Sequence, residues 1–131
     1  MDFKIESRSP KTCKFFEAIM PSMIEQLGLT NSRKDVLIKI EKCETLGMTV
    51  AVDILGAYVI VIKPASIRSM GLTLAHEMIH VQQMARGILK TVKGINYWRG
   101  RKYSKKTKYL DMPWEIGAFS RQEIIFRRSI E

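Results

Sequence analysis

The sequence predicts an α+β fold with an N-terminal helix, a small and mainly antiparallel sheet of three to four strands, and two later helices. Three observations predict it. Apolar residues recur at helical spacing over residues 11–27, they alternate with polar residues over 36–62, and helical spacing returns after Pro64. No internal repeat and no linker-like tract divides the 131 residues, so we expect a single domain over 1–131.

The first helix is expected over residues 11–27, with a break or kink at Pro21 and an end at Gly28. Strands are then predicted by alternating or continuous apolar residues at 36–41, 48–54 and 57–62. The connections between these strands are short, which favours antiparallel pairing of neighbours.

The two later helices are marked by proline and glycine. The second is expected between Pro64 and Gly87, with Ser66 or Ser69 as its N-cap. Residues 95–98 have the composition of a short strand. The last helix is expected to begin at Pro113, because proline suits the first turn of a helix, and to run to about residue 129.

Composition indicates a globular chain, with 46% hydrophobic and 27% charged residues. The longest apolar run, residues 54–62, is too short to span a bilayer, so we expect no membrane insertion. The first six residues form no apolar signal core, which favours a cytoplasmic location. Two cysteines, Cys13 and Cys43, fit reduced thiols better than a disulfide framework.

Positive charge is concentrated in one segment, residues 86–108. The net charge of +9 comes from 22 basic and 13 acidic residues, and nine of the basic residues lie in this segment without a single acid. They are Arg86, Lys90, Lys93, Arg99, Arg101, Lys102, Lys105, Lys106 and Lys108. The segment is either a solvated loop or a surface that attracts nucleic acid or an acidic protein.

The residues with the clearest chemistry are His76-Glu77-Met78-Ile79-His80. On a helix, two histidines four positions apart project from one face, about one turn from each other. Their imidazoles can both bind one Zn²⁺, and Glu77 can then act as general base toward a metal-bound water. The chain has only two histidines, and both belong to this motif.

A catalytic zinc site needs a third protein ligand. Because there is no third histidine, the candidates are the few acids downstream of the motif. We favour Glu115, which opens the last helix 35 residues after His80, and keep Glu123, two turns later, as the alternative. Two imidazoles and a carboxylate suit zinc better than other divalent metals.

The chain resembles the gluzincins, in particular small single-domain and phage-encoded HExxH proteins. The resemblance rests on residues 74–83, 97–103 and 109–118, and it covers roughly residues 57–125. It implies a zincin-like fold and a zinc metallopeptidase, in which Glu115 and Ala118 match the Glu-x-x-Ala signature of the family. It also implies that Glu115 completes the metal site with His76 and His80.

The sequence departs from the family pattern beside that signature. Many gluzincins have an acid next to the alanine, whereas this chain has Gly117 and Phe119. No carboxylate is therefore predicted at the usual place to orient a ligand histidine, and Asp111 or a backbone carbonyl would have to accept that hydrogen bond.

Hydrolysis of a peptide or protein substrate also needs a donor for the developing oxyanion. Tyr97 and Tyr109 are the leading candidates, ahead of Tyr103, Arg99 and Arg101. The strand at 57–62 is expected to be the sheet edge beside the motif helix, where an extended peptide could add as a further strand near Tyr58.

Two other functions remain open. A deformylase-like amide hydrolase would use the same HExxH motif together with an upstream cysteine, for which Cys43 is the candidate. A non-catalytic protein would keep zinc as a structural feature and bind nucleic acid or a host protein through residues 86–108.

Overall fold

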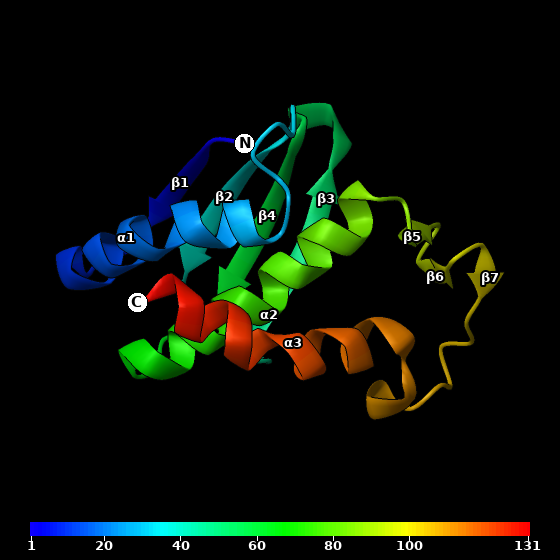
Figure 1. The fold of residues 1–131 in the computed structure, drawn as a ribbon. Helices are drawn as coiled ribbons and strands as arrows, with labels where there is room; N and C mark the ends of the chain where they lie inside the picture. The colour runs from blue at the N-terminus through cyan, green and yellow to red at the C-terminus, as the bar shows by residue number, and fades with distance from the viewer.

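The computed structural model describes residues 1–131 as an α+β fold with three α-helices and two small sheets. The main sheet contains β1 (Phe3–Glu6), β2 (Asp35–Ile40), β3 (Gly47–Val52) and β4 (Ala57–Ile62), in the order β1-β2-β4-β3. The three helices cover one face of this sheet (Figure 1). The predicted α+β class is therefore confirmed.

The expected antiparallel pairing is wrong for most of this sheet. Strands β1 and β2 are parallel, β2 and β4 are parallel, and only β3 and β4 form an antiparallel pair. The reason is that β3 does not pair with β2. Residues 41–46 carry the chain to the outer side of the sheet, and β4 then returns between β2 and β3.

This order also changes which strand is the edge. Strand β4, predicted to be the edge, lies inside the sheet, and β3 is the edge strand. Tyr58 of β4 is 2% exposed and belongs to the hydrophobic core. It packs between the sheet and the helices, so the predicted position of Tyr58 near substrate is wrong.

Helix α1 (Pro10–Gln26) connects β1 to β2 and explains their parallel arrangement. Ser9 caps its N-terminus by accepting a hydrogen bond from the Thr12 amide at 3.2 Å. Pro21 lies inside the helix, which continues through it to Gln26. Its inner face buries Phe16, Met20 and Met23 against the sheet and the other helices.

Helices α2 (Ile67–Ala85) and α3 (Pro113–Ser129) pack closely on each other. Gly71 of α2 permits this approach, because a Cβ at that position would overlap the ring of Phe126, whose Cδ1 would be 3.0 Å away. Ser66 caps α2 through the amide of Ser69 at 3.2 Å, as expected for a helix that begins after Pro64. The packing of α2 on α3 places the middle of α2 beside the first turns of α3.

A second, three-stranded antiparallel sheet follows α2. It consists of β5 (Leu89–Val92), β6 (Ile95–Trp98) and β7 (Arg101–Lys102), and it projects from the body of the protein beyond the C-terminal end of α2 (Figure 1). The short strand predicted at 95–98 is confirmed as β6. Trp114 at the start of α3 anchors this sheet through edge or tilted contacts with Trp98 and Tyr103.

None of the helices combines the length and the apolar character that crossing a membrane would require.

Candidate metal centre

The packing of α2 on α3 brings three predicted ligand residues together. His76 and His80 project from α2 with ring centroids 4.9 Å apart, and Glu115 comes from the first turn of α3. The Nε2 atoms of His76 and His80 lie 2.8 and 3.0 Å from the same oxygen, Oε1 of Glu115. All three residues are at most 7% exposed. The site is a buried His-His-Glu group that could hold a metal ion.

Two glutamine side chains fix the orientation of the imidazoles. Gln83 donates its amide to the carbonyl oxygen of Trp114 at 3.1 Å, so its Oε1 faces Nδ1 of His80 at 2.8 Å. Gln122 of α3 places Oε1 2.7 Å from Nδ1 of His76. An amide oxygen can only accept a hydrogen bond. With these oxygens as acceptors, each Nδ1 carries the hydrogen, and each Nε2 of the neutral imidazole directs its lone pair at Glu115.

Lone pairs from His76, His80 and Glu115 thus converge on one point. Such a group repels itself unless a cation lies within it, and that cation can be a proton or a metal ion. Burial alone would lower the pKa of His80, but the hydrogen bond that protonated His80 donates to Glu115, and the negative charge of Glu115, outweigh burial and raise the pKa. Burial alone would raise the pKa of Glu115, yet the hydrogen bonds that both histidines donate from Nε2 when they are protonated hold it at about 2. The donor set fits a bound metal ion.

Glu77 lies beside this group but does not belong to it. Its carboxylate points toward the edge strand, where the Thr49 hydroxyl donates to Oε1 at 2.7 Å. Burial raises the pKa of Glu77, against the lowering effect of His80 and of the Thr49 hydrogen bond. Gly47 permits β3 to approach this closely, because a Cβ there would lie 2.7 Å from Thr73 Cγ2 and 3.2 Å from Glu77 Cγ.

The His76-His80-Glu115 group and Glu77 line one cavity of about 750 Å³. Its walls come from β3, α2, the small sheet and the start of α3. Phe119 packs on the His76 ring, with the ring centroids 4.6 Å apart. Tyr109 reaches in from the short 3-10 helix Tyr109–Asp111 that precedes α3, and it donates its hydroxyl to Glu115 Oε1 at 3.1 Å. Burial, followed by the charge of Glu115, raises the pKa of Tyr109, so the phenol stays protonated at neutral pH.

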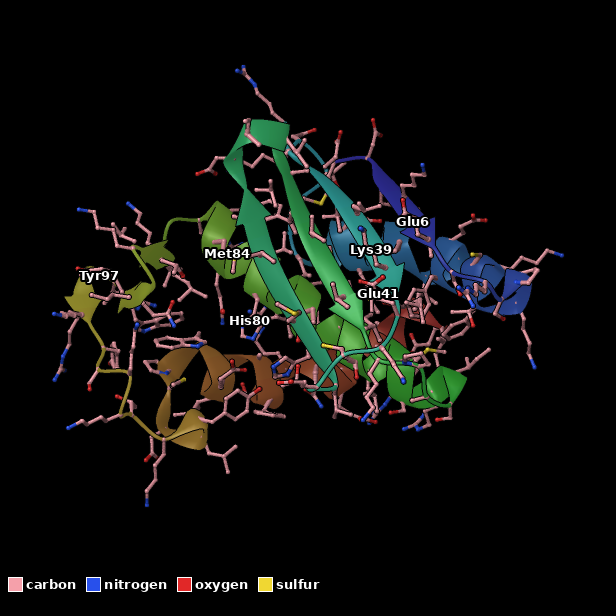
Figure 2. All side chains as sticks on the ribbon, turned by 180° about the vertical axis from the view of Figure 1, so that it is seen from behind. Glu6, Lys39, Glu41, His80, Met84 and Tyr97 are labelled. Atoms are coloured by element: carbon pink, nitrogen blue, oxygen red, sulfur yellow. The ribbon has the colours of Figure 1, made fainter.

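The structure does not bring the other candidate tyrosine to this cavity. Tyr97 lies on β6 in the projecting sheet, well separated from His80 in Figure 2. It does not line the cavity, whereas its neighbour Asn96 does. Tyr103, the third tyrosine considered, instead packs edge-on against Trp114.

Other candidate residues also lie elsewhere. Glu123 is exposed and pairs with Arg68 at 3.3 Å, so it is no part of the ligand group. Asp111 is exposed, and the two glutamines take the orienting role for which the sequence offered Asp111. Cys43, the residue required by the deformylase-like alternative, is a free thiol 3.6 Å from the Thr45 hydroxyl and outside the ligand group.

Sequence reasoning missed Gln83, Gln122 and Thr49. For the glutamines a signal existed: Gln83 is three residues after His80, and Gln122 is seven after Glu115, spacings that share a helix face. For Thr49 there was none, because its contact with Glu77 joins segments 28 residues apart.

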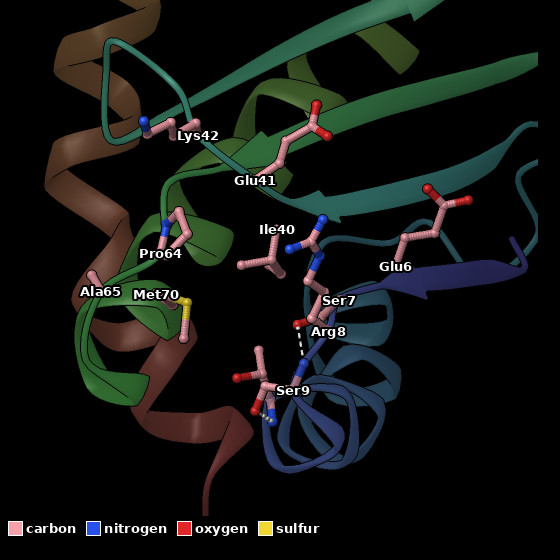
Figure 3. A pocket seen from close by; sticks show the side chains of 11 residues that line it. Glu6, Ser7, Arg8, Ser9, Ile40, Glu41, Lys42, Pro64, Ala65 and Met70 are labelled. Atoms are coloured by element: carbon pink, nitrogen blue, oxygen red, sulfur yellow. Dashed lines mark hydrogen bonds between the residues drawn. The ribbon is translucent and has the colours of Figure 1, made fainter.

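A second cavity, of about 760 Å³, lies where β1 and β2 end and α1 begins (Figure 3). Arg8 and Lys42 line it together with Glu6 and Glu41, so both signs of charge are present. It contains none of the residues of the candidate metal centre.

In comparisons with known proteins, the chain matches no family model, no curated protein and no solved structure.

Proposed function

We propose that the protein is a zinc-dependent peptidase of the gluzincin type, with a minimal zincin-like domain. The observation that carries the proposal is the convergence of the His76 and His80 Nε2 atoms on Glu115, with Glu77 lining the same cavity. Two neutral imidazoles and one carboxylate form a donor set typical of catalytic zinc, and they leave a coordination position free for substrate or water.

His76, His80 and Glu115 would hold the zinc ion. When bound, zinc would polarise the carbonyl of the scissile peptide bond and make water easier to deprotonate at neutral pH. Glutamines 83 and 122 keep the imidazoles oriented, so little reorganisation is needed on binding.

Glu77 would accept the proton of the attacking water at its carboxylate and pass it to the leaving amine. Burial raises its pKa, which brings the carboxylate closer to the range suited to proton transfer near neutral pH. The Thr49 hydroxyl occupies Oε1, so the other oxygen, Oε2, is the one available for the proton.

Tyr109 would donate a hydrogen bond to the oxyanion that forms during attack. Its hydroxyl is within hydrogen-bond distance of Glu115 and its raised pKa preserves the donor proton. Tyr109 is 52% exposed, which leaves the ring room to turn toward substrate.

An extended peptide or protein segment is the substrate class that fits the cavity. The outer edge of β3 is unpaired in the sheet, and β3 contributes Gly47, Met48 and Thr49 to the cavity wall. A peptide that adds to this edge as a further strand would lie across the cavity beside Glu77. The edge is β3 rather than the strand at 57–62 that the sequence suggested.

The proposal is tested with Glu77→Gln, which keeps the shape of the side chain but removes the base. We expect zinc-loaded Glu77→Gln to retain its zinc and to lose hydrolysis of denatured casein by at least 100-fold. Glu123→Gln, the same change at an exposed position, should hydrolyse casein like the wild type. Hydrolysis that persists in Glu77→Gln at the wild-type rate would overturn the proposal.

A further inference from the structure

The small sheet has two faces with different chemistry. Side chains alternate along a strand, and Thr91 of β5 pairs with Asn96 of β6, both of which line the metal cavity. The residues next to them along each strand, Lys90 on β5 and Tyr97 on β6, therefore point to the opposite side. On that side Tyr97 pairs with Lys90 on one neighbouring strand and with Lys102 on the other.

Tyr97 thus lies in a row of three side chains, with a lysine on each side of the ring. Adjacent strands are about 4.8 Å apart, so both ammonium groups lie within reach of a chain that crosses the ring. Lys90 and Lys102 are exposed, and Tyr97 is partly exposed. We call this row, Lys90-Tyr97-Lys102, the outer face of the small sheet.

The positive charge around the outer face is not neutralised by the protein. All nine basic residues of the 86–108 segment are exposed, and none of them forms an ion pair. The β5–β6 turn adds Lys93, and Lys105 Nζ lies 3.7 Å from where a Cβ of the adjacent Gly94 would be. This positive charge is therefore available to attract an anionic partner.

We propose that the outer face binds single-stranded nucleic acid, with one base stacked on Tyr97 and the flanking phosphates on Lys90 and Lys102. An aromatic ring on a sheet surface, bordered by cations, is the arrangement that binds single strands without strong sequence preference. An acidic protein would be attracted by the lysines but would make no use of a ring placed between them. The inference is independent of the proposed peptidase activity, because the cavity lies on the opposite face.

Binding is tested by fluorescence anisotropy with a labelled oligothymidylate and an oligouridylate of 20 nucleotides, at several salt concentrations. We expect binding that weakens steeply as salt rises. Tyr97→Ala should weaken it about tenfold and leave the salt dependence unchanged, whereas Tyr97→Phe should bind like the wild type. Lys90→Ala with Lys102→Ala should weaken binding and reduce the slope of log affinity against log salt by about 1.4.

A control with the same loss of charge is available on the far side of the molecule. Lys4 of β1 and Lys14 of α1 are both exposed, and Lys4→Ala with Lys14→Ala should leave binding within about twofold of the wild type, as expected for charges remote from the contact. Glu77→Gln should also bind normally, whatever its effect on hydrolysis.

Several outcomes would overturn the inference. These are no binding at low salt, an affinity unchanged by Tyr97→Ala, or an equal loss of affinity in the Lys4 and Lys14 control. Competition by poly-glutamate as effective as that by the oligonucleotide, at matched charge, would point to an acidic protein instead. Equal affinity for vesicles of anionic phospholipid would point to a membrane surface.

Discussion

Nδ1 of His80 and Oε1 of Gln83 lie 2.8 Å apart on one face of α2, and the amide end of Gln83 is held by the Trp114 carbonyl. The chain therefore links the imidazole, through one glutamine, to the start of α3, from which Glu115 also projects. The same helix that supplies two candidate ligands also fixes the tautomer of one of them.

The orienting glutamines should matter for metal affinity. We expect Gln83→Ala and Gln122→Ala each to weaken zinc binding by about 10- to 100-fold, because the imidazoles lose the acceptors that hold them in place. Affinity is measured by competition with a chromophoric chelator. Glu123→Ala, next to Gln122 but exposed, serves as the control, and an equal effect there would contradict the assignment.

The third ligand can be identified by metal content. Glu115→Gln keeps the size of the side chain and removes its charge, so we expect the purified variant to contain little zinc by elemental analysis. Glu123→Gln should contain as much zinc as the wild type. Equal zinc in the Glu115 and Glu123 variants would show that the group His76-His80-Glu115 does not hold the metal.

Zinc affinity should fall with decreasing pH, starting above pH 6.5. The metal needs a neutral imidazole, and the hydrogen bond to Glu115 raises the pKa of His80 above its usual 6.5. Below that raised pKa, the proton competes with zinc for His80. Glu115, with a pKa of about 2, stays ionised and adds nothing to this dependence above pH 4.

The measurement is a chelator competition between pH 5.5 and 8.5, combined with calorimetry in buffers of different ionisation enthalpy. At pH 6 binding should release protons and be weaker than at pH 8. An affinity that is constant over this range would contradict the raised pKa of His80.

Thr49 should act through Glu77. Thr49→Val removes the hydroxyl with little change in shape, so Glu77 loses a hydrogen bond while the sheet edge is preserved. We expect casein hydrolysis to fall about tenfold with unchanged zinc content. The Glu77 carboxylate loses the hydrogen bond that holds it in place, and hydrogen bonds to charged groups contribute about 1.5–3 kcal/mol. Thr49→Ser should restore most of the rate, and a Ser variant as impaired as Val would argue for packing alone.

Gly71→Ala should destabilise the fold although alanine favours helix. The propensity gain is about 1 kcal/mol, but the added methyl group would overlap the Phe126 ring, and overpacking of this kind costs about 1–3 kcal/mol. We expect a lower free energy of unfolding in urea with a chelator present. Phe126→Leu, which makes room, should reduce the effect of Gly71→Ala, and purely additive losses would contradict this account.

The α+β class and the approximate extent of each helix followed from the sequence, since apolar spacing reports directly which residues share a face. The spacing of four between His76 and His80 likewise determined that both imidazoles lie on one side of α2. Glu115 was the favoured partner because so few acids follow the motif.

Only the tertiary structure decided the order of the strands, the edge position of β3 and the separation of Tyr97 from Tyr109. Alternation of apolar residues is the same in parallel and antiparallel strands, so it could not show that β4 inserts between β2 and β3. Contacts such as Thr49 with Glu77 depend on where distant segments meet. The two histidines are close in sequence, so their shared face could be predicted from spacing. The glutamines that orient them, the Glu115 carboxylate and the adjoining cavity depend on how α2, α3 and β3 pack.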